Sequence, residues 1–211
     1  MPESRISPDE ASPIGPDQAS RISLDGTWDF LHIADDRLTG PADIRSIAVP
    51  GPWQAQFADL RMRAGIGIYR RAFEIQEDWI AETVFLRFGA VFHNARIWVN
   101  GRLVGANEGG FLPFGFDVTA HLKPGPNEIK VRVDSPTDNP SEFPESPFAE
   151  IPFGKQSWYG PLSGIWQSVY LERRSPDHVT RVRLAPDRES GRVTAEAFFA
   201  QPLSDAAEVR I

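Results

Sequence analysis

The stretch KQSWYG, residues Lys155 to Gly160, brings together side chains that could bind a carbohydrate. The aromatic faces of Trp158 and Tyr159 can pack on the apolar faces of a sugar ring. Lys155 and Gln156 can hydrogen-bond to its hydroxyl groups. The two aromatic residues could instead anchor their loop to the protein core, and the sequence leaves both roles open.

Acidic residues are frequent just before this stretch, where Glu142, Glu145 and Glu150 follow one another. Glycosidases hold two carboxylates about 5–10 Å apart across the sugar that they cleave. No rigid element of this sequence holds any two of these carboxylates in place. We therefore interpret them as a solvated acidic loop rather than as a catalytic pair.

Other kinds of catalytic or cofactor site have little support in the sequence. Its four histidines are scattered without metal-ligand spacing, and it contains no cysteine. It also lacks the G-x-S-x-G nucleophile motif and the Walker A phosphate-binding motif. We expect no bound metal and no cofactor.

The overall charge argues against two classes of partner. The formal net charge is −7, whereas nucleic acids and anionic membranes require a basic surface. The N-terminal residues contain no apolar run typical of a signal peptide, so we expect a cytoplasmic protein.

Turn-forming residues and short alternating segments predict an all-β fold. The chain contains 19 Pro and 17 Gly. Ile129, Val131 and Val133 alternate with Lys130 and Arg132, which is the period of two expected of a half-buried strand. The expected strands are Thr27–Ile33, Arg45–Trp53, Ile68–Ile75, Thr83–Val91, Phe114–Thr119, Asn127–Asp134 and Gly164–Arg173, with a hairpin in His93–Gly105 and single helical turns in Gln76–Glu82 and Val118–Leu122. The strand in Arg45–Trp53 is expected to be halted by Pro50, Gly51 and Pro52.

This pattern predicts a two-sheet β-sandwich of the jelly-roll type with three parts along the chain. Residues 1–20 are expected to be disordered or loosely attached, and residues 21–174 to form the sandwich. Residues 175–211 would be the incomplete start of an immunoglobulin-like sandwich. The long segment Ser135–Ser163 has little periodicity, which is typical of a functional loop.

Five motifs then occur in order between Ile22 and Arg173. They are LDGTWDF (Leu24–Phe30), VPGPWQ (Val49–Gln54), GIGIYRRAFEI (Gly65–Ile75), IWVNGRLVGANEGGFLPFGFDVT (Ile97–Thr119) and GIWQSVYLE (Gly164–Glu172). Together they resemble the N-terminal sugar-binding domain of glycoside hydrolase family two, which includes β-galactosidases, β-glucuronidases and β-mannosidases.

The resemblance implies a jelly roll followed by an immunoglobulin-like domain and a TIM barrel with both catalytic glutamates. This sequence has no barrel, so it resembles a fragment of such an enzyme, and no residue inherits a catalytic role. In the family, two jelly-roll loops reach the rim of the barrel's pocket. They correspond here to Leu60–Gly67, which contains Arg63, and to the segment with Lys155, Gln156 and Trp158.

These loops differ from those of the β-galactosidase members. The resemblance predicts an Asn in the first loop and acidic residues in the second for such an enzyme. The first loop here carries Arg61 and Arg63, and the second carries Lys155. We interpret this local positive charge as favouring an acidic sugar such as a glucuronide.

The leading interpretation is a non-catalytic sugar-binding and scaffold domain of a retaining exo-glycosidase. It would pack intramolecularly on a TIM barrel, shape a pocket for a β-glycoside and contribute to a homo-oligomer interface. One alternative is an autonomous carbohydrate-binding module that binds sugar through Trp158 and Tyr159 without a hydrolase partner. Another is a structural domain whose aromatic loop docks on a protein.

Overall fold

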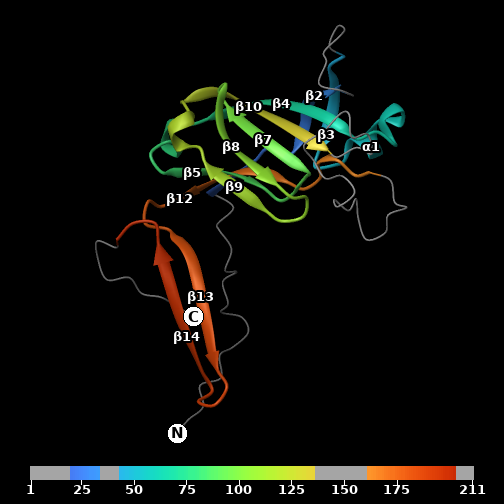
Figure 1. The fold of residues 1–211 in the computed structure, drawn as a ribbon. Coiled ribbons are helices and arrows are strands. Elements are labelled where there is room, and N and C mark those ends of the chain that lie inside the picture. Colours follow the sequence, from blue (N-terminus) through green and yellow to red (C-terminus); the bar gives the residue numbers. More distant parts are fainter. Residues whose placement is uncertain (1–19, 34–42, 136–160, 203–211) are drawn as a thin grey trace, which may run out of the picture.

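The computed structural model describes residues 20–33, 43–135 and 161–202, and within them it is almost entirely β-structure (Figure 1). A six-stranded and a four-stranded antiparallel sheet enclose one core. The predicted all-β sandwich is therefore confirmed. No helix in the described part of the chain is long and apolar enough to cross a membrane.

Neighbouring strands in each sheet are mostly distant in the sequence. From one edge to the other, the larger sheet contains β3 (Arg45–Val49), β2 (Gly26–Ile33), β4 (Gly65–Ile75), β10 (Gly125–Ser135), β7 (Asn94–Val99) and β8 (Arg102–Glu108). From one edge to the other, the smaller sheet contains β1 (Arg21–Ser23), β12 (Val169–Arg174), β5 (Thr83–Phe88) and β9 (Phe114–Asp117). Two further pairs are β6 (Val91–Phe92) with β11 (Gly164–Ile165), and β13 (Val179–Asp187) with β14 (Arg192–Phe199).

The core follows the alternation that the sequence predicts. Ile129, Val131 and Val133 of β10 are fully buried, whereas Lys130 and Arg132 between them are only partly buried. Burying one such aliphatic side chain contributes about 1.5–3 kcal/mol. The central pair, β4 and β10, stays in register over eleven residues, from Gly125 opposite Ile75 to Ser135 opposite Gly65. This long ladder fixes where both strands end.

The Trp98-bearing hairpin β7–β8 forms the edge of the larger sheet, as predicted. Its turn residues Asn100 and Gly101 have φ angles of 51° and 78°. Those values match the type I′ turn that Asn-Gly favours. The Asn100 amide donates to the His121 carbonyl at 2.8 Å and to Asn127 Oδ1 at 2.7 Å, and it accepts from the Glu128 N–H at 3.0 Å. The hairpin is therefore tied to the start of β10 and acts as scaffold.

The strand expected in Arg45–Trp53 ends at Val49, just before Pro50, as predicted, and the chain continues through α1 (Trp53–Gln56) and the 3₁₀ turn η3 (Ala58–Leu60). One segment differs from the sequence-based expectations. The strand expected at Gly164–Arg173 is divided into β11 and β12. It breaks because the Trp166 indole donates to the Gly110 carbonyl and the Gln167 N–H donates to the Ala90 carbonyl. The two expected helical turns are confirmed as η4 (Glu77–Trp79) and η5 (Thr119–His121).

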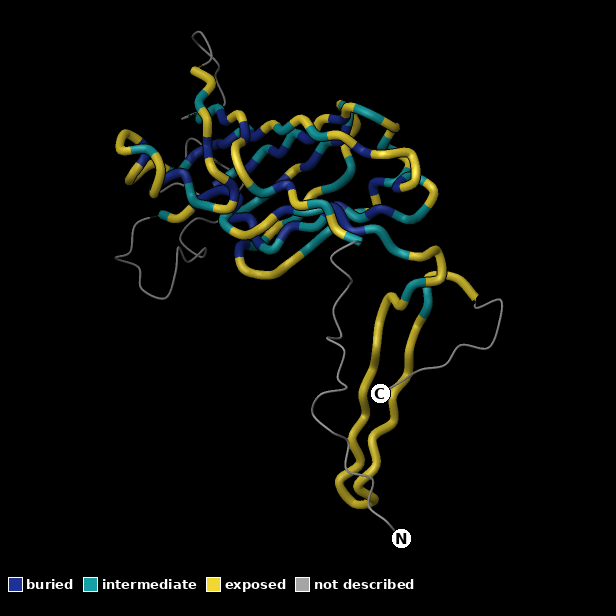
Figure 2. Tube along the Cα trace, turned by 180° about the vertical axis from the view of Figure 1, so that it is seen from behind, coloured by how far each residue is buried: buried dark blue, intermediate teal, exposed yellow. Residues whose placement is uncertain are grey.

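The hairpin β13–β14 projects away from the sandwich and is exposed along nearly all of its length (Figure 2). Val182 (58%), Leu184 (64%) and Val193 (62%) are among its exposed apolar side chains. A two-stranded ribbon has little stability of its own in water. The assignment of this hairpin to an immunoglobulin-like domain stays a prediction.

Replacing Asn100 by Ala is expected to lower the free energy of unfolding by about 2–3 kcal/mol. The change removes three hydrogen bonds and places a Cβ residue without a compensating side-chain bond at positive φ. Urea unfolding measures the loss. The matched control is Arg102→Ala on the same hairpin, where the exposed side chain should contribute less than about 0.5 kcal/mol. Equal losses in the two variants would contradict the structural role of Asn100.

Candidate functional site

Two loops that the sequence singles out begin and end close together at one end of the sandwich. Strand β10 ends at Ser135, opposite Gly65 at the start of β4. The Ser135 and Ser163 hydroxyls are 2.5 Å apart. The segment between them contains Lys155, Gln156, Trp158 and Tyr159, and all four fall outside the described residues. Both described ends of that segment therefore meet the loop that carries Arg63.

A buried glutamine joins these elements. The Gln54 amide donates to the Arg63 carbonyl at 2.9 Å and to Ser163 Oγ at 2.8 Å, and its oxygen accepts from the Ser163 N–H at 2.9 Å. Gln54 is 6% exposed and Ser163 is fully buried. A buried amide of this kind stabilises the fold mainly because it gives hydrogen-bond partners to polar groups that water cannot reach.

The Arg63 carbonyl accepts a second hydrogen bond, from the Trp53 indole at 2.8 Å. Trp53 is fully buried, so it fixes the backbone of Arg63 to the core. We call residues Leu60–Ala64 the arginine loop. Its Arg61, Met62 and Arg63 side chains are exposed, and neither arginine makes an ion pair with a residue in the described ranges. The loop thus presents two positive charges on a rigid backbone.

His32 holds the other end of the arginine loop. Its Nε2–H donates to the Ala64 carbonyl at 2.8 Å, and its ring packs edge-on against Trp53 at 5.5 Å. Burial lowers the pKa of His32, and the nearby charges of Arg45 and Arg63 lower it further, although the bond to Ala64 opposes them. The neutral ring is the form that this site favours.

Close packing at Gly164 positions β11 beside the arginine loop. A Cβ at this position would lie 2.2 Å from the Tyr69 hydroxyl oxygen, and the residue has a φ of +103°. Tyr69 is fully buried, and its burial raises the pKa of the phenol. Tyr69 therefore acts as a packing residue and not as an acid or base.

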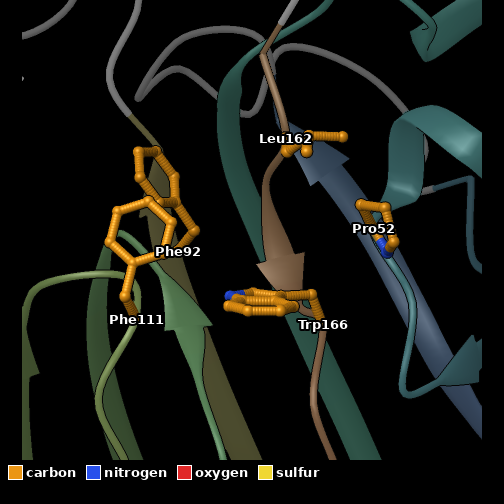
Figure 3. Close-up of a pocket in the computed structure, with 5 residues that line it drawn as sticks. All are labelled: Pro52, Phe92, Phe111, Leu162 and Trp166. Carbon is orange, nitrogen blue, oxygen red and sulfur yellow. The ribbon is translucent and has the colours of Figure 1, made fainter. Parts of the chain in front are cut away.

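An apolar cavity lies next to β11, with a volume of about 250 Å³ (Figure 3). The residues that line it are Pro52, Phe92, Phe111, Leu162 and Trp166. None of these side chains offers a hydrogen-bonding group to the cavity except the Trp166 indole N–H, which already donates to the Gly110 carbonyl at 2.8 Å. The sequence interpretation missed this cavity. The signals for it were the aromatic residues in GGF and GIW, which it had counted only as family motifs.

One carboxylate among the described residues is buried, that of Glu172 on β12. It is 2% exposed and pairs with Arg21, Arg87 and Arg174 at 3.3, 3.1 and 2.9 Å. Burial raises the pKa of Glu172, but these three cations outweigh it, so the pKa lies below its ordinary value. A carboxylate that stays ionised cannot act as a general acid at neutral pH. Glu172 instead joins β1, β5 and β12.

No group of three His, Asp or Glu side chains in the described ranges is arranged to hold a metal ion. Glu142, Glu145 and Glu150, the carboxylates considered from the sequence, lie outside these ranges. Within the described part of the chain, the candidate site therefore consists of a cationic loop, an apolar cavity and the buried hydrogen bonds behind them.

Comparison with known proteins gives this architecture a family. The model of the sugar binding domain of glycosyl hydrolases family 2 matches residues 22–175. A β-glucuronidase of Formosa agariphila is 35% identical over 113 residues, which are 53% of this chain and 11% of the relative. A β-galactosidase of Arthrobacter sp. (strain B7) is 29% identical over 203 residues, which are 92% of this chain and 18% of the relative. The chain thus spans less than a fifth of these two curated relatives.

Solved structures agree with this result. The β-glucuronidase of Bifidobacterium dentium, complexed with coumarin-3-O-glucuronide, aligns with a TM-score of 0.65 and 28% identity, covering 82% of this chain and 33% of that one. The β-glucuronidase of Ruminococcus gnavus, in complex with D-glucaro 1,5-lactone, aligns with a TM-score of 0.70 over 89% of this chain and 36% of that one. The second likeness, at 23% identity, concerns the fold alone.

Replacing Gln54 by Ala is expected to lower the free energy of unfolding by about 2–4 kcal/mol, because it leaves the buried Ser163 N–H without a partner and removes the hydrogen bonds that Gln54 donates to Ser163 Oγ and to the Arg63 carbonyl. Gln56 is a matched control. It also makes two hydrogen bonds to backbone, at Ala48, but it is exposed. Water can replace it, so Gln56→Ala should lose about 1 kcal/mol or less. Similar losses in denaturant titrations of both variants would contradict the role given to Gln54.

The stability of the protein is expected to depend on the protonation of His32. Because its pKa is lower in the folded than in the unfolded chain, the unfolded chain binds a proton first as the pH falls below 6.5. The stabilisation is therefore complete above pH 6.5 and decreases as the pH falls through the folded pKa. Urea unfolding at pH 7.5 and 5.5 should show a larger loss for the wild type than for His32→Gln. An equal loss would assign the pH dependence to other groups.

Proposed function

This chain belongs to glycosyl hydrolase family 2, and from that premise we propose that its sandwich is the non-catalytic, substrate-facing domain of a retaining β-glycosidase. The catalytic carboxylates would come from a barrel outside residues 1–211. The names of the relatives, β-glucuronidase and β-galactosidase, support a β-glycoside as the substrate. Such an enzyme cleaves its substrate by double displacement through a glycosyl-enzyme intermediate.

The observation that carries this proposal is the rigid arginine loop. Its backbone is held by Trp53, Gln54 and His32, while the Arg61 and Arg63 side chains remain exposed. A loop that is fixed from below and free at its tip suits the rim of a substrate pocket. We expect Lys155, Gln156, Trp158 and Tyr159 to extend the same rim.

The charge of the loop favours an acidic sugar, such as a glucuronide, over a neutral one. A guanidinium can bind a carboxylate through two parallel hydrogen bonds, which a neutral hydroxymethyl group cannot accept in the same way. The formal net charge of the chain is −7, so exposed arginines without an ion-pair partner in the described ranges mark a local site for an anion.

The two arginines would hold the sugar through a group that does not react. A carboxylate keeps its charge from the bound substrate to the transition state, so its ion pair stabilises both to a similar extent. Binding of this kind lowers KM and leaves kcat nearly unchanged. The role of the loop is therefore to select and orient the sugar while the barrel performs the chemistry.

The rest of the enzyme would also cover the hairpin β13–β14. We propose that this ribbon is the first part of an immunoglobulin-like sandwich whose further strands pack on Val182, Leu184 and Val193. We also propose that the sandwich packs on a barrel in the same chain. A second copy of the protein would contribute a homo-oligomer interface.

Replacing Arg63 by Ala in the native enzyme is expected to raise KM for an aryl β-glucuronide about 10–100-fold, the loss of one charge-assisted hydrogen-bond pair. The kcat for this substrate should change little, and kcat/KM for the matching galactoside should change less than twofold. Arg96→Ala is the control, because Arg96 is exposed on β7 and distant in sequence from the loop. Steady-state kinetics with both substrates measure the effect.

The outcome that would contradict the acidic-sugar proposal is an unchanged ranking of the two substrates in Arg63→Ala and in Arg63→Ala/Lys155→Ala. An immunoblot of the native protein tests the larger proposal. A band well above 23.5 kDa, the mass of this chain, is expected. A band near 23.5 kDa, with sugar binding but no hydrolysis, would favour an autonomous carbohydrate-binding module.

A further inference from the structure

The apolar cavity is a preformed slot on the surface. Trp166 lies between Phe92 and Phe111 on one side and Pro52 and Leu162 on the other, and its ring is seen edge-on in Figure 3. One face of the indole is thus turned toward the space between the two walls. Phe111 and Leu162 remain 57% and 53% exposed, so the slot opens to solvent.

Several contacts hold the slot open without a ligand. The indole of Trp166 is fixed by its hydrogen bond to the Gly110 carbonyl. Phe111 packs edge-on against Trp166 at 6.2 Å and against Phe92 at 5.7 Å. A Cβ at Gly110 would lie 2.1 Å from Phe92, so this turn packs directly on the wall of the slot. Little conformational entropy remains to be lost when a ligand binds.

The slot and the arginine loop share their supports. Pro52 precedes Trp53, whose indole binds the Arg63 carbonyl. Leu162 precedes Ser163, which is bonded to Gln54, and the amide of Gln54 also binds the Arg63 carbonyl. One wall of the slot is thus formed by Pro52 and Leu162, which adjoin in the chain the residues of the hydrogen-bond network behind the cationic loop.

We propose that this slot is a binding subsite for a flat, apolar aromatic ring. In the glycosidase proposed above, on which this identification of the ligand rests, the ring is the aglycone of a β-glycoside. The enzyme's preferred substrates are then aryl glycosides, with the sugar toward the arginine loop and the aglycone stacked on Trp166.

The chemistry of the lining selects the ring over the sugar. A sugar needs hydrogen-bonding partners for its hydroxyl groups, and the lining side chains leave none free. An aromatic ring needs only apolar area and a stacking partner, and Trp166 offers an open π-face. A volume of about 250 Å³ is enough for a group of one or two fused rings.

Binding of 2-naphthol to the 211-residue chain tests the subsite directly. In ¹H–¹⁵N spectra, the indole N–H of Trp166, assigned with Trp166→Phe, is expected to shift saturably at millimolar 2-naphthol or below. The buried indoles of Trp28 and Trp53, which donate to backbone carbonyls, should not move. Glucuronic acid alone should leave the Trp166 signal unchanged.

Phe111→Ser is expected to weaken this binding at least fivefold. Leu103→Ser is the matched control, because Leu103 on β8 is 58% exposed and lies outside the slot. The proposal is overturned if 2-naphthol does not saturate the Trp166 shift up to its solubility limit, or if the two serine variants weaken binding equally.

Kinetics separate this proposal from the glycosidase proposal. In the native enzyme, Phe111→Ser should reduce kcat/KM for 2-naphthyl β-glucuronide at least fivefold and leave the methyl glucuronide unaffected. Hydrolysis without that difference overturns the aglycone subsite and leaves the glycosidase function standing. Ring binding by a protein that hydrolyses no β-glycoside contradicts the glycosidase function while confirming the ring site.

Discussion

The backbone carbonyl of Arg63 accepts hydrogen bonds from two buried side chains, and the local structure at the candidate-site end of the sandwich depends on this arrangement. Trp53 and Gln54 can reach it only because the chain turns into α1 directly after β3. Gln54 then extends the connection to Ser163, and Ser163 to Ser135. Three segments far apart in the sequence are thereby held by one small polar network inside an otherwise apolar core. Such a network is costly if any partner is lost, which makes it a strong constraint on local geometry.

The sheets supply the frame in which this network sits. The long ladder between β4 and β10 brings Gly65 and Ser135 to the same level, so the arginine loop and the segment after β10 begin side by side. On the smaller sheet, Glu172 and its three arginines join strands that are distant in sequence. At the β8 edge of the larger sheet, Asn100 closes the turn of the β7–β8 hairpin. Burial of apolar side chains therefore holds the two sheets together, and a few polar side chains fix where the strands and turns at their ends lie.

Much of the fold could be predicted from the sequence because period-two alternation and turn residues act locally. The strands around Ile129–Val133 and the Asn100-Gly101 turn are examples. The helical turn at Trp53–Gln56 could not be predicted in this way, because it is four residues long and is stabilised by bonds to Arg63 and Ser163. The break after Ile165 has the same origin, since the partner of Trp166 is Gly110. For the site, Arg63 could be singled out by charge and family resemblance, whereas the apolar slot required the fold to bring four separate segments together.

The backbone and the side chain of Arg63 have separate roles, which has a consequence for how such a domain can change over generations. Its main-chain oxygen accepts the hydrogen bonds that fix the loop, while its side chain makes no ion pair with a residue in the described part of the chain. Mutations that exchange the side chain at this position can therefore accumulate without destabilising the fold. In the proposed enzyme, such mutations would change the sugar preference at little cost in stability. Under the proposed role of the loop, substrate preference could thus evolve separately from the stability of the fold.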